Sequence, residues 1–97
     1  MFLITELSIN LACNFGRVGV VRVLLARGAK QVRPGKTDTA MHLAAYHNHI
    51  EVVKLLLAAP GASDALKTKD YDGNTPLKLA KGRAEIKALL RAASATK

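Results

Sequence analysis

Three stretches of the chain share one pattern, in which apolar residues recur at intervals of three or four positions. Their members are Val18, Val21, Leu24 and Leu25; Ile50, Val53, Leu56 and Leu57; and Ile86, Leu89 and Leu90. This spacing places apolar side chains on one face of an α-helix. Arg22, Lys54 and Lys87 fall off that face. We therefore expect three amphipathic helices whose cations reach solvent while their aliphatic stems cover neighbouring methyl groups.

A shorter segment, rich in leucine and alanine, precedes each of these stretches. Its members are Leu11 and Ala12; Leu43, Ala44 and Ala45; and Leu77, Leu79 and Ala80. An isolated helix this short is marginal in water, so its stability has to come from packing. We expect each short helix to pack against its longer partner and against the next unit, with the alanines allowing close approach.

The short and long segments together make one unit that occurs three times. Leu11 and Leu43 are 32 positions apart, and Leu43 and Leu79 are 36 apart, on either side of a period of about 33. We predict a single domain over residues 1–97, with units at about 5–34, 35–69 and 70–93 and a polar tail at 94–97. Because each unit buries its apolar face only against neighbours, stability is a sum of unit and interface terms.

The middle unit carries the most specific motif. Its first helix reads T-A-M-H-L-A-A from Thr39, and its second reads H-I-E-V-V-K-L-L-L from His49. This sequence resembles the ankyrin repeat, and the resemblance covers about residues 5–92. The last unit looks like a C-terminal capping repeat. The resemblance implies an all-α solenoid of about three helix-turn-helix units joined by β-hairpin-like loops.

Several residues indicate where the helices and turns begin. Thr39 and Thr75 are suited to cap a helix, since a hydroxyl can accept a hydrogen bond from the first turn, and Pro76 is suited to the first helical position. Residues 70–74 contain Asp-Gly, which predicts a tight projecting turn. In the loop at 34–38, Thr37 stands two residues before the capping Thr39, where the family places a glycine. Residues 62–69 form a longer connection than usual. Residues 2–4 are apolar and suggest an open N-terminal end.

Composition limits the kind of core and the redox chemistry. Hydrophobic residues make up 49% of the chain and aromatic residues only 4%, so aliphatic side chains and alanine must fill the core. A single cysteine, Cys13, excludes an internal disulfide framework. The N-terminus lacks the basic start of a signal peptide, and no stretch has the apolar length of a membrane span. We expect a cytoplasmic or nuclear location.

The residues that could carry chemistry have structural interpretations. His42 and His49 occupy the histidine positions of the ankyrin pattern, which implies structural hydrogen bonds, and only His47 has no such assignment. Offsets of five and seven residues do not align the three imidazoles on one helix face, which disfavours zinc. Cys13 stands at an alanine position and is expected to be a small core residue. We expect no catalytic residue, no metal and no cofactor, and hence no enzyme.

The formal net charge of +8 points to an anionic partner or to a solvated basic surface. One group of cations lies among residues 17–36 without an acidic residue between them, and a second contains Lys78, Lys81, Arg83, Lys87 and Arg91. Few aromatic side chains are present that could stack on bases. A solvated surface or an acidic protein partner is therefore favoured over nucleic acid, with RNA, DNA or acidic lipid as the alternative.

The resemblance implies that a partner protein binds in a concave groove between the loop fingers and the first helices. The corresponding positions in this chain are Asn14, Phe15, Arg27, Lys36, Asp38, Tyr46, His47, Tyr71, Asp72 and Asn74. Phe15 could equally belong to the core. The function predicted is a non-catalytic protein-interaction module. The alternatives are a basic surface for nucleic acid or another anion, and a fragment of a longer ankyrin array. Self-association through the open N-terminal end is a further expectation.

Overall fold

The computed structural model describes residues 9–31 and 39–95, and these residues form helices arranged in pairs. Residues 9–14 are helical and pair with α2 (Val18–Ala26). The second pair is α3 (Ala40–Tyr46) with α4 (Ile50–Ala58), and the third is α6 (Pro76–Leu79) with α7 (Ala84–Ala95). The described ranges contain no β-strand. The predicted all-α class is confirmed.

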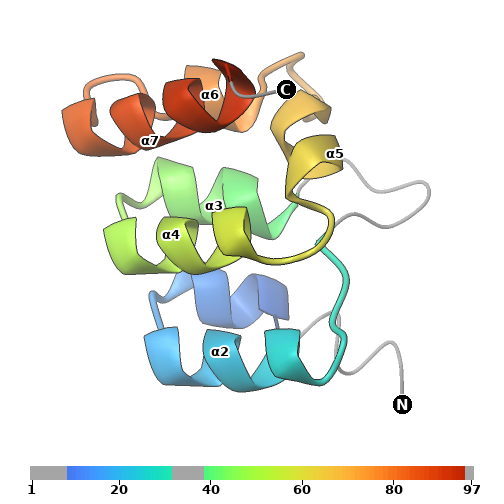
Figure 1. The fold of residues 1–97 in the computed structure, drawn as a ribbon. Helices are drawn as coiled ribbons and strands as arrows, with labels where there is room; N and C mark the ends of the chain where they lie inside the picture. The colour runs from blue at the N-terminus through green and yellow to red at the C-terminus, as the bar shows by residue number, and fades with distance from the viewer. Residues whose placement is uncertain (1–8, 32–38, 96–97) are drawn as a thin grey trace.

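The helix pairs stack on one another, as Figure 1 shows. The second helices form one layer, in which α2 contacts α4 and α4 contacts α7. The first helices form the other layer, in which α3 contacts α6. The helix at 9–14 begins this layer at the blue end of the stack. The result is a short solenoid in which α4 lies between its two neighbours.

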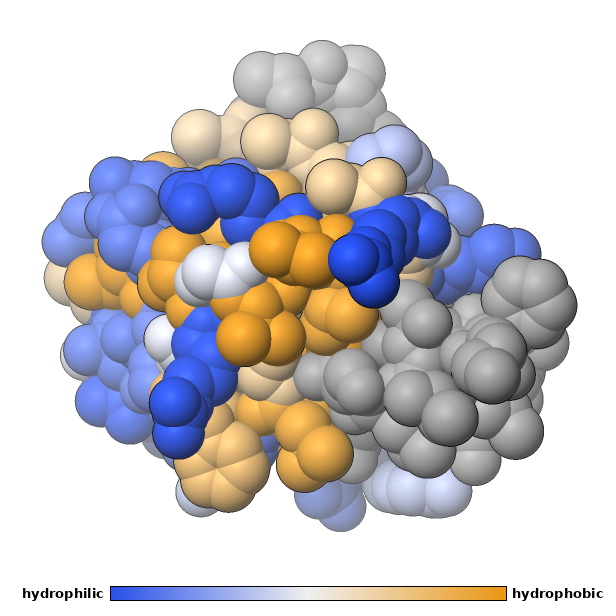
Figure 2. All heavy atoms as spheres, turned by 90° about the horizontal axis from the view of Figure 1, so that it is seen from below, coloured by the Kyte–Doolittle hydropathy of each residue, from blue (hydrophilic) through white to orange (hydrophobic). Residues whose placement is uncertain are grey.

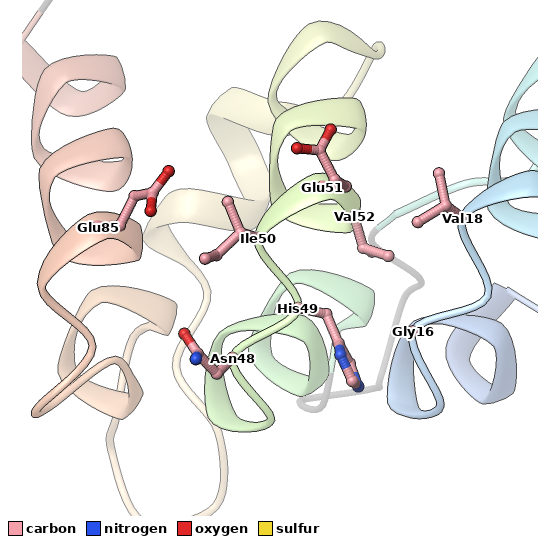
Figure 3. Close-up of a pocket in the computed structure, with 8 residues that line it drawn as sticks. All are labelled: Gly16, Val18, Asn48, His49, Ile50, Glu51, Val52 and Glu85. Atoms are coloured by element: carbon pink, nitrogen blue, oxygen red, sulfur yellow. The ribbon is translucent and has the colours of Figure 1, made fainter.

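Aliphatic and small side chains fill the core between the pairs. From the predicted apolar stripe, Val21, Val53, Leu56, Ile86 and Leu90 are fully buried, and the other six members are half-buried. The predicted helix register is confirmed. Val52 lies outside the predicted stripe and is also fully buried. Its side chain points from α4 toward Val18 of the preceding pair (Figure 3), so this burial results from stacking.

Threonine caps begin the first helices of the second and third units, as predicted. The Thr39 hydroxyl oxygen accepts a hydrogen bond from the backbone N–H of His42 at 3.2 Å. Thr75 accepts one from the N–H of Lys78 at 3.4 Å. Pro76 occupies the first helical position, where its missing N–H leaves no hydrogen bond unmade.

The turn between the two helices of each unit requires one residue with positive φ. These residues are Gly16 with a φ of 68°, Asn48 with 61° and Gly82 with 80°. The left-handed conformation is open to glycine and is tolerated by asparagine, whereas other L-residues are strained there. Asn48 therefore takes the place that glycine has in the other two units.

The turn at residues 70–74 projects between the second and third units. The N–H of Asp70 donates to the carbonyl oxygen of Asn74 at 2.9 Å, and the N–H of Gly73 donates back to Asp70 at 3.0 Å. These bonds give a hairpin-like finger, as predicted.

The long connection at 62–69 contains a helix that the sequence analysis did not predict, α5 (Ala62–Lys67). Gly61, with a φ of 89°, precedes it. Ala65 is buried, and α5 contacts α4, α6 and α7. The apolar positions Ala62, Ala65 and Leu66 share one face, which explains the helix. The loop at 34–38 and the apolar end at 2–4 lie outside the described residues.

None of the helices in the described ranges combines the length and the apolarity that crossing a bilayer requires.

Candidate protein-interaction surface

His42 joins α3 to the finger of the following unit. Its Nδ1 accepts a hydrogen bond from the backbone N–H of Thr39 at 3.2 Å and lies 2.9 Å from the Thr39 hydroxyl. The ring proton is therefore on Nε2, which donates to the carbonyl oxygen of Asn74 at 2.8 Å. The side chain is buried. The structural interpretation of His42 is confirmed, and the imidazole holds the finger in position.

The turns between paired helices are connected from unit to unit by a second set of hydrogen bonds. His49 donates from Nε2 to the carbonyl oxygen of Asn14 at 2.9 Å. Arg83 donates from Nη2 to the carbonyl oxygen of Tyr46 at 3.2 Å. Asn14 and Tyr46 are equivalent positions, 32 residues apart. Thus, in the second and the third unit, the side chain of the residue just before the second helix donates to the last residue of the first helix of the preceding unit.

Gly16 makes room for the His49 ring. A Cβ atom at this position would lie 2.6 Å from Nδ1 of His49, closer than real Cβ contacts. At the equivalent Gly82 a Cβ would meet nothing within 4 Å. The glycine at 16 is therefore required both for its positive φ and for the approach of the imidazole.

Exposed aromatic side chains gather beside these turns. Phe15 is 65% exposed and Tyr46 is 57% exposed, so the structure places Phe15 on the surface rather than in the core. The ring of Tyr46 meets His47 edge-on with centroids 5.0 Å apart, and His47 stacks on His49 at 5.9 Å. We call Phe15, Tyr46 and His47 the loop row. Hydrogen bonds of the two turns hold its backbone in place.

The finger presents a second exposed group. Tyr71 is 88% exposed and Asp72 is also exposed, whereas Asn74 is half-buried and its main chain binds His42 and Asp70. Hydrogen bonds from the backbone N–H groups of Asn74 and Asp72 hold the pKa of the Asp70 carboxyl below its ordinary value of 3.8. The carboxylate thus orders the backbone that displays Tyr71.

The structure brings only part of the predicted binding set together. Asn14, Phe15, Tyr46 and His47 lie at the turns between paired helices, and Tyr71, Asp72 and Asn74 lie in the finger. Arg27 is exposed at the C-terminal end of α2, at the opposite end of that helix from the turns. Lys36 and Asp38 lie outside the described residues.

A hollow of about 480 Å³ opens between α2, α4 and α7. Eight residues line it, namely Gly16, Val18, Asn48, His49, Ile50, Glu51, Val52 and Glu85. In Figure 3 the His49 ring points toward Gly16 and away from both carboxylates. Glu51 pairs instead with Lys54 at 3.6 Å. Within the described residues, no three His, Cys, Asp or Glu side chains are grouped so that they could hold a metal ion.

Cys13 is fully buried in the first unit. Burial raises the pKa of its thiol to about 12, because the charged thiolate would lose its hydration. The thiol is therefore neutral at physiological pH, and the interpretation of Cys13 as a small core residue is confirmed.

Cations line a hollow of about 470 Å³ at the C-terminal end of the stack. Its lining residues are Asn74, Leu77, Lys78, Lys81, Lys87 and Arg91. We call it the basic hollow. Arg83, which the sequence grouped with these cations, does not line it and instead binds the Tyr46 carbonyl oxygen.

Comparison with known proteins identifies the repeat. A family model for ankyrin repeats in three copies matches residues 9–97. Ankyrin repeat and SOCS box protein 3 from Bos taurus is 31% identical over 83 residues, which are 84% of this chain and 16% of that protein. The Homo sapiens protein of the same name is 33% identical over 81 residues, which are 82% of this chain and 16% of that protein. The chain thus spans about a sixth of the length of these relatives. Because the family model covers both the described helix pairs and the turns between them, the chain belongs to the ankyrin repeat family.

Proposed function

We propose that this chain is a non-catalytic module that binds a partner protein across the loop row and the finger. Ankyrin repeats are protein–protein interaction modules and are generally non-catalytic. The observation that carries the proposal is the exposed Tyr46, whose backbone carbonyl is fixed by Arg83 and whose ring rests against His47. A tyrosine held in this way loses little conformational freedom on binding.

Tyrosine is also a favoured anchor in interfaces, because one ring offers a large apolar face and a polar tip. Tyr71 adds a second exposed ring on the finger, which His42 and Asp70 hold in place. A partner that contacts both groups would lie along the layer of first helices. The formal net charge of +8 favours an acidic partner, since opposite charge accelerates association.

The test is a paired substitution, Tyr46→Ala with Tyr71→Ala, read in both stability and binding. Because both rings are largely exposed, we expect the free energy of unfolding to change by less than about 1 kcal/mol. Partner affinity should fall by more than about tenfold, as for loss of interface anchors. The matched control, Tyr46→Phe with Tyr71→Phe, keeps the rings and should retain most binding. If the alanine variant binds the partner with unchanged affinity, the proposal is wrong.

The basic hollow supports a second candidate function, binding of an anionic target such as nucleic acid. Four cations line it without a carboxylate among the lining residues. Phosphate contacts release counterions, so binding of this kind weakens steeply as salt rises. Binding through aromatic anchors depends less on salt.

A pull-down with the purified chain, with and without nuclease and at low and near-physiological salt, separates the two candidates. A discrete protein retained after nuclease and salt supports the interaction module. Nucleic acid that is lost on either treatment supports the basic hollow, and Lys87→Glu with Arg91→Glu should then abolish retention.

A further inference from the structure

The N-terminal end of the described stack has the same surface that the other units bury against a neighbour. Val20 and Val52 are equivalent positions, 32 residues apart, yet Val20 is 49% exposed and Val52 is fully buried. Val23 is 49% exposed, whereas its equivalent Leu55 is half-buried. Leu11 is 60% exposed, and its equivalent Leu43 is half-buried. Val52 points toward Val18 of the preceding unit (Figure 3), and residues 9–31 contain no counterpart of that unit that could cover Val20.

Figure 2 views the stack from this end and shows apolar side chains gathered over its centre, with hydrophilic ones around them. Val20 and Val23 are exposed on α2, and the exposed Arg17 and Arg27 are its N-cap and C-cap. These four positions follow one another at intervals of three or four residues, so they lie along one side of the helix. Leu11 adds an apolar side chain from the neighbouring helix. We call these five residues the end face.

Arg17 shows what kind of group the end face is suited to bind. It occupies the same position as His49 and Arg83, each of which donates to a carbonyl oxygen of the preceding unit. Among the described residues, Arg17 has no such acceptor and its side chain is exposed. The Arg17 side chain is therefore a hydrogen-bond donor at the place where a neighbouring helix would present acceptor oxygen atoms.

The charge around the end face argues against a second copy as the occupant. Two end faces meeting about a two-fold axis would bring arginines together from both copies. A head-to-tail contact would place Arg17 and Arg27 near the other end of the stack. At that end, Lys87 occupies the position that the buried Val53 has in the middle unit. Lys87 lines the basic hollow together with Lys78 and Arg91. Like charges oppose both arrangements.

We propose that the end face binds an amphipathic helix of a partner protein that carries apolar residues in the middle and carboxylates at both ends. Arg17 and Arg27 are ten positions apart, or about 15 Å along a helix. The partner's carboxylates should therefore lie about three turns apart, and leucine or similar side chains between them would cover Val20 and Val23. This surface is separate from the one proposed above, because it uses neither Tyr46 nor the finger.

The probe is a synthetic helical peptide of about 18 residues with leucines at intervals of three or four and two glutamates ten positions apart. Binding is followed by the NMR signals of the valine methyl groups in the full chain. We expect shifts at Val20 and Val23 and none at the finger. Val20→Lys should weaken binding by more than about tenfold, and Val23→Lys gives an independent check. Circular dichroism shows whether each variant is folded.

Charge reversal supplies the decisive comparison. Arg17→Glu with Arg27→Glu should abolish binding of the glutamate peptide and restore binding to a peptide with lysines in place of the glutamates. The matched control, Lys67→Glu with Lys69→Glu, makes the same change in net charge at exposed positions in and just after α5, outside both the end face and the basic hollow, and should leave binding unchanged. The proposal is overturned if the peptide leaves Val20 and Val23 unshifted, or if both peptides bind equally. Concentration-dependent dimers in sedimentation that Val20→Lys abolishes would overturn it in favour of a second copy. The peptide experiments do not depend on Tyr46 or Tyr71, so unchanged partner affinity in the Tyr46→Ala, Tyr71→Ala variant would not bear on them.

Discussion

His42 has a role that depends on both of its ring nitrogens. It accepts from Thr39 within its own unit and donates to Asn74 in the next. The family pattern led us to expect a structural histidine, but only the structure shows that the second partner lies 32 residues downstream. A leucine at this position would fill similar space but would remove the side-chain acceptor of the Thr39 N–H and one of the two donors to the Asn74 carbonyl oxygen, which also accepts from the N–H of Asp70.

We therefore expect His42→Leu to lower the free energy of unfolding by about 1–3 kcal/mol, the range for removing a partner from buried polar groups. His47→Leu is the matched control, because that ring is exposed and should change stability by less than about 0.5 kcal/mol. Urea unfolding followed by circular dichroism measures both. Equal effects of the two substitutions would contradict the role assigned to His42.

At the scale of the element, the turns between paired helices give a controlled comparison of two glycines. Gly82→Ala should cost about 1–2 kcal/mol, because alanine is strained at positive φ. Gly16→Ala should cost more, because its Cβ would also collide with His49. The excess should disappear when both proteins carry His49→Ala. If the two alanine variants are equally stable in the wild-type background, the close approach of His49 is not rigid.

The finger should loosen in acid because of Asp70. The pKa of its carboxyl is lower in the folded chain than the ordinary 3.8. As the pH falls, the carboxyl is therefore protonated in the unfolded finger before it is protonated in the folded one. The stabilisation is present above 3.8 and is lost as the pH falls through the folded pKa. We expect hydrogen-exchange protection of the Asp72 and Asn74 amides to fall in that window. Asp70→Asn keeps an acceptor oxygen without titrating, and its protection should not change between pH 5 and pH 3. A pH profile that is identical in both proteins would exclude Asp70 as the cause.

At the scale of the whole molecule, α4 connects the stack, since it contacts α2, α3 and α7. Leu56 is fully buried in this helix. Leu56→Ala should lower the free energy of unfolding by about 2–5 kcal/mol, through lost contacts and a residual cavity. Val23→Ala, at a half-exposed position of the first unit, should cost less than about 1 kcal/mol. A loss below about 0.5 kcal/mol for Leu56→Ala in denaturant unfolding would contradict the helix register.

The sequence by itself determined the paired helices and their caps, because these depend on spacings within about ten residues. The recurrence of that local pattern at about 33 residues determined the order of the units. The apolar stripes at 18–25 and 50–57, the capping threonines and the Asp-Gly turn are local signals of this kind. The short helix α5 was missed because only six residues carry its pattern and neighbouring helices supply its stability.

Only the tertiary structure decided which faces meet and which polar groups pair across units. Gln31 is buried and donates from Nε2 to the carbonyl oxygens of Leu56 at 2.8 Å and Pro60 at 3.0 Å, and no local pattern indicated this role. Stacking likewise distinguishes Val52 from Val20, which occupy equivalent positions in similar local sequences, yet Val52 is fully buried and Val20 is 49% exposed. In a repeat protein, residues equivalent in sequence differ only in their neighbours, so burial, and with it the candidate binding surface, is a property of the stack.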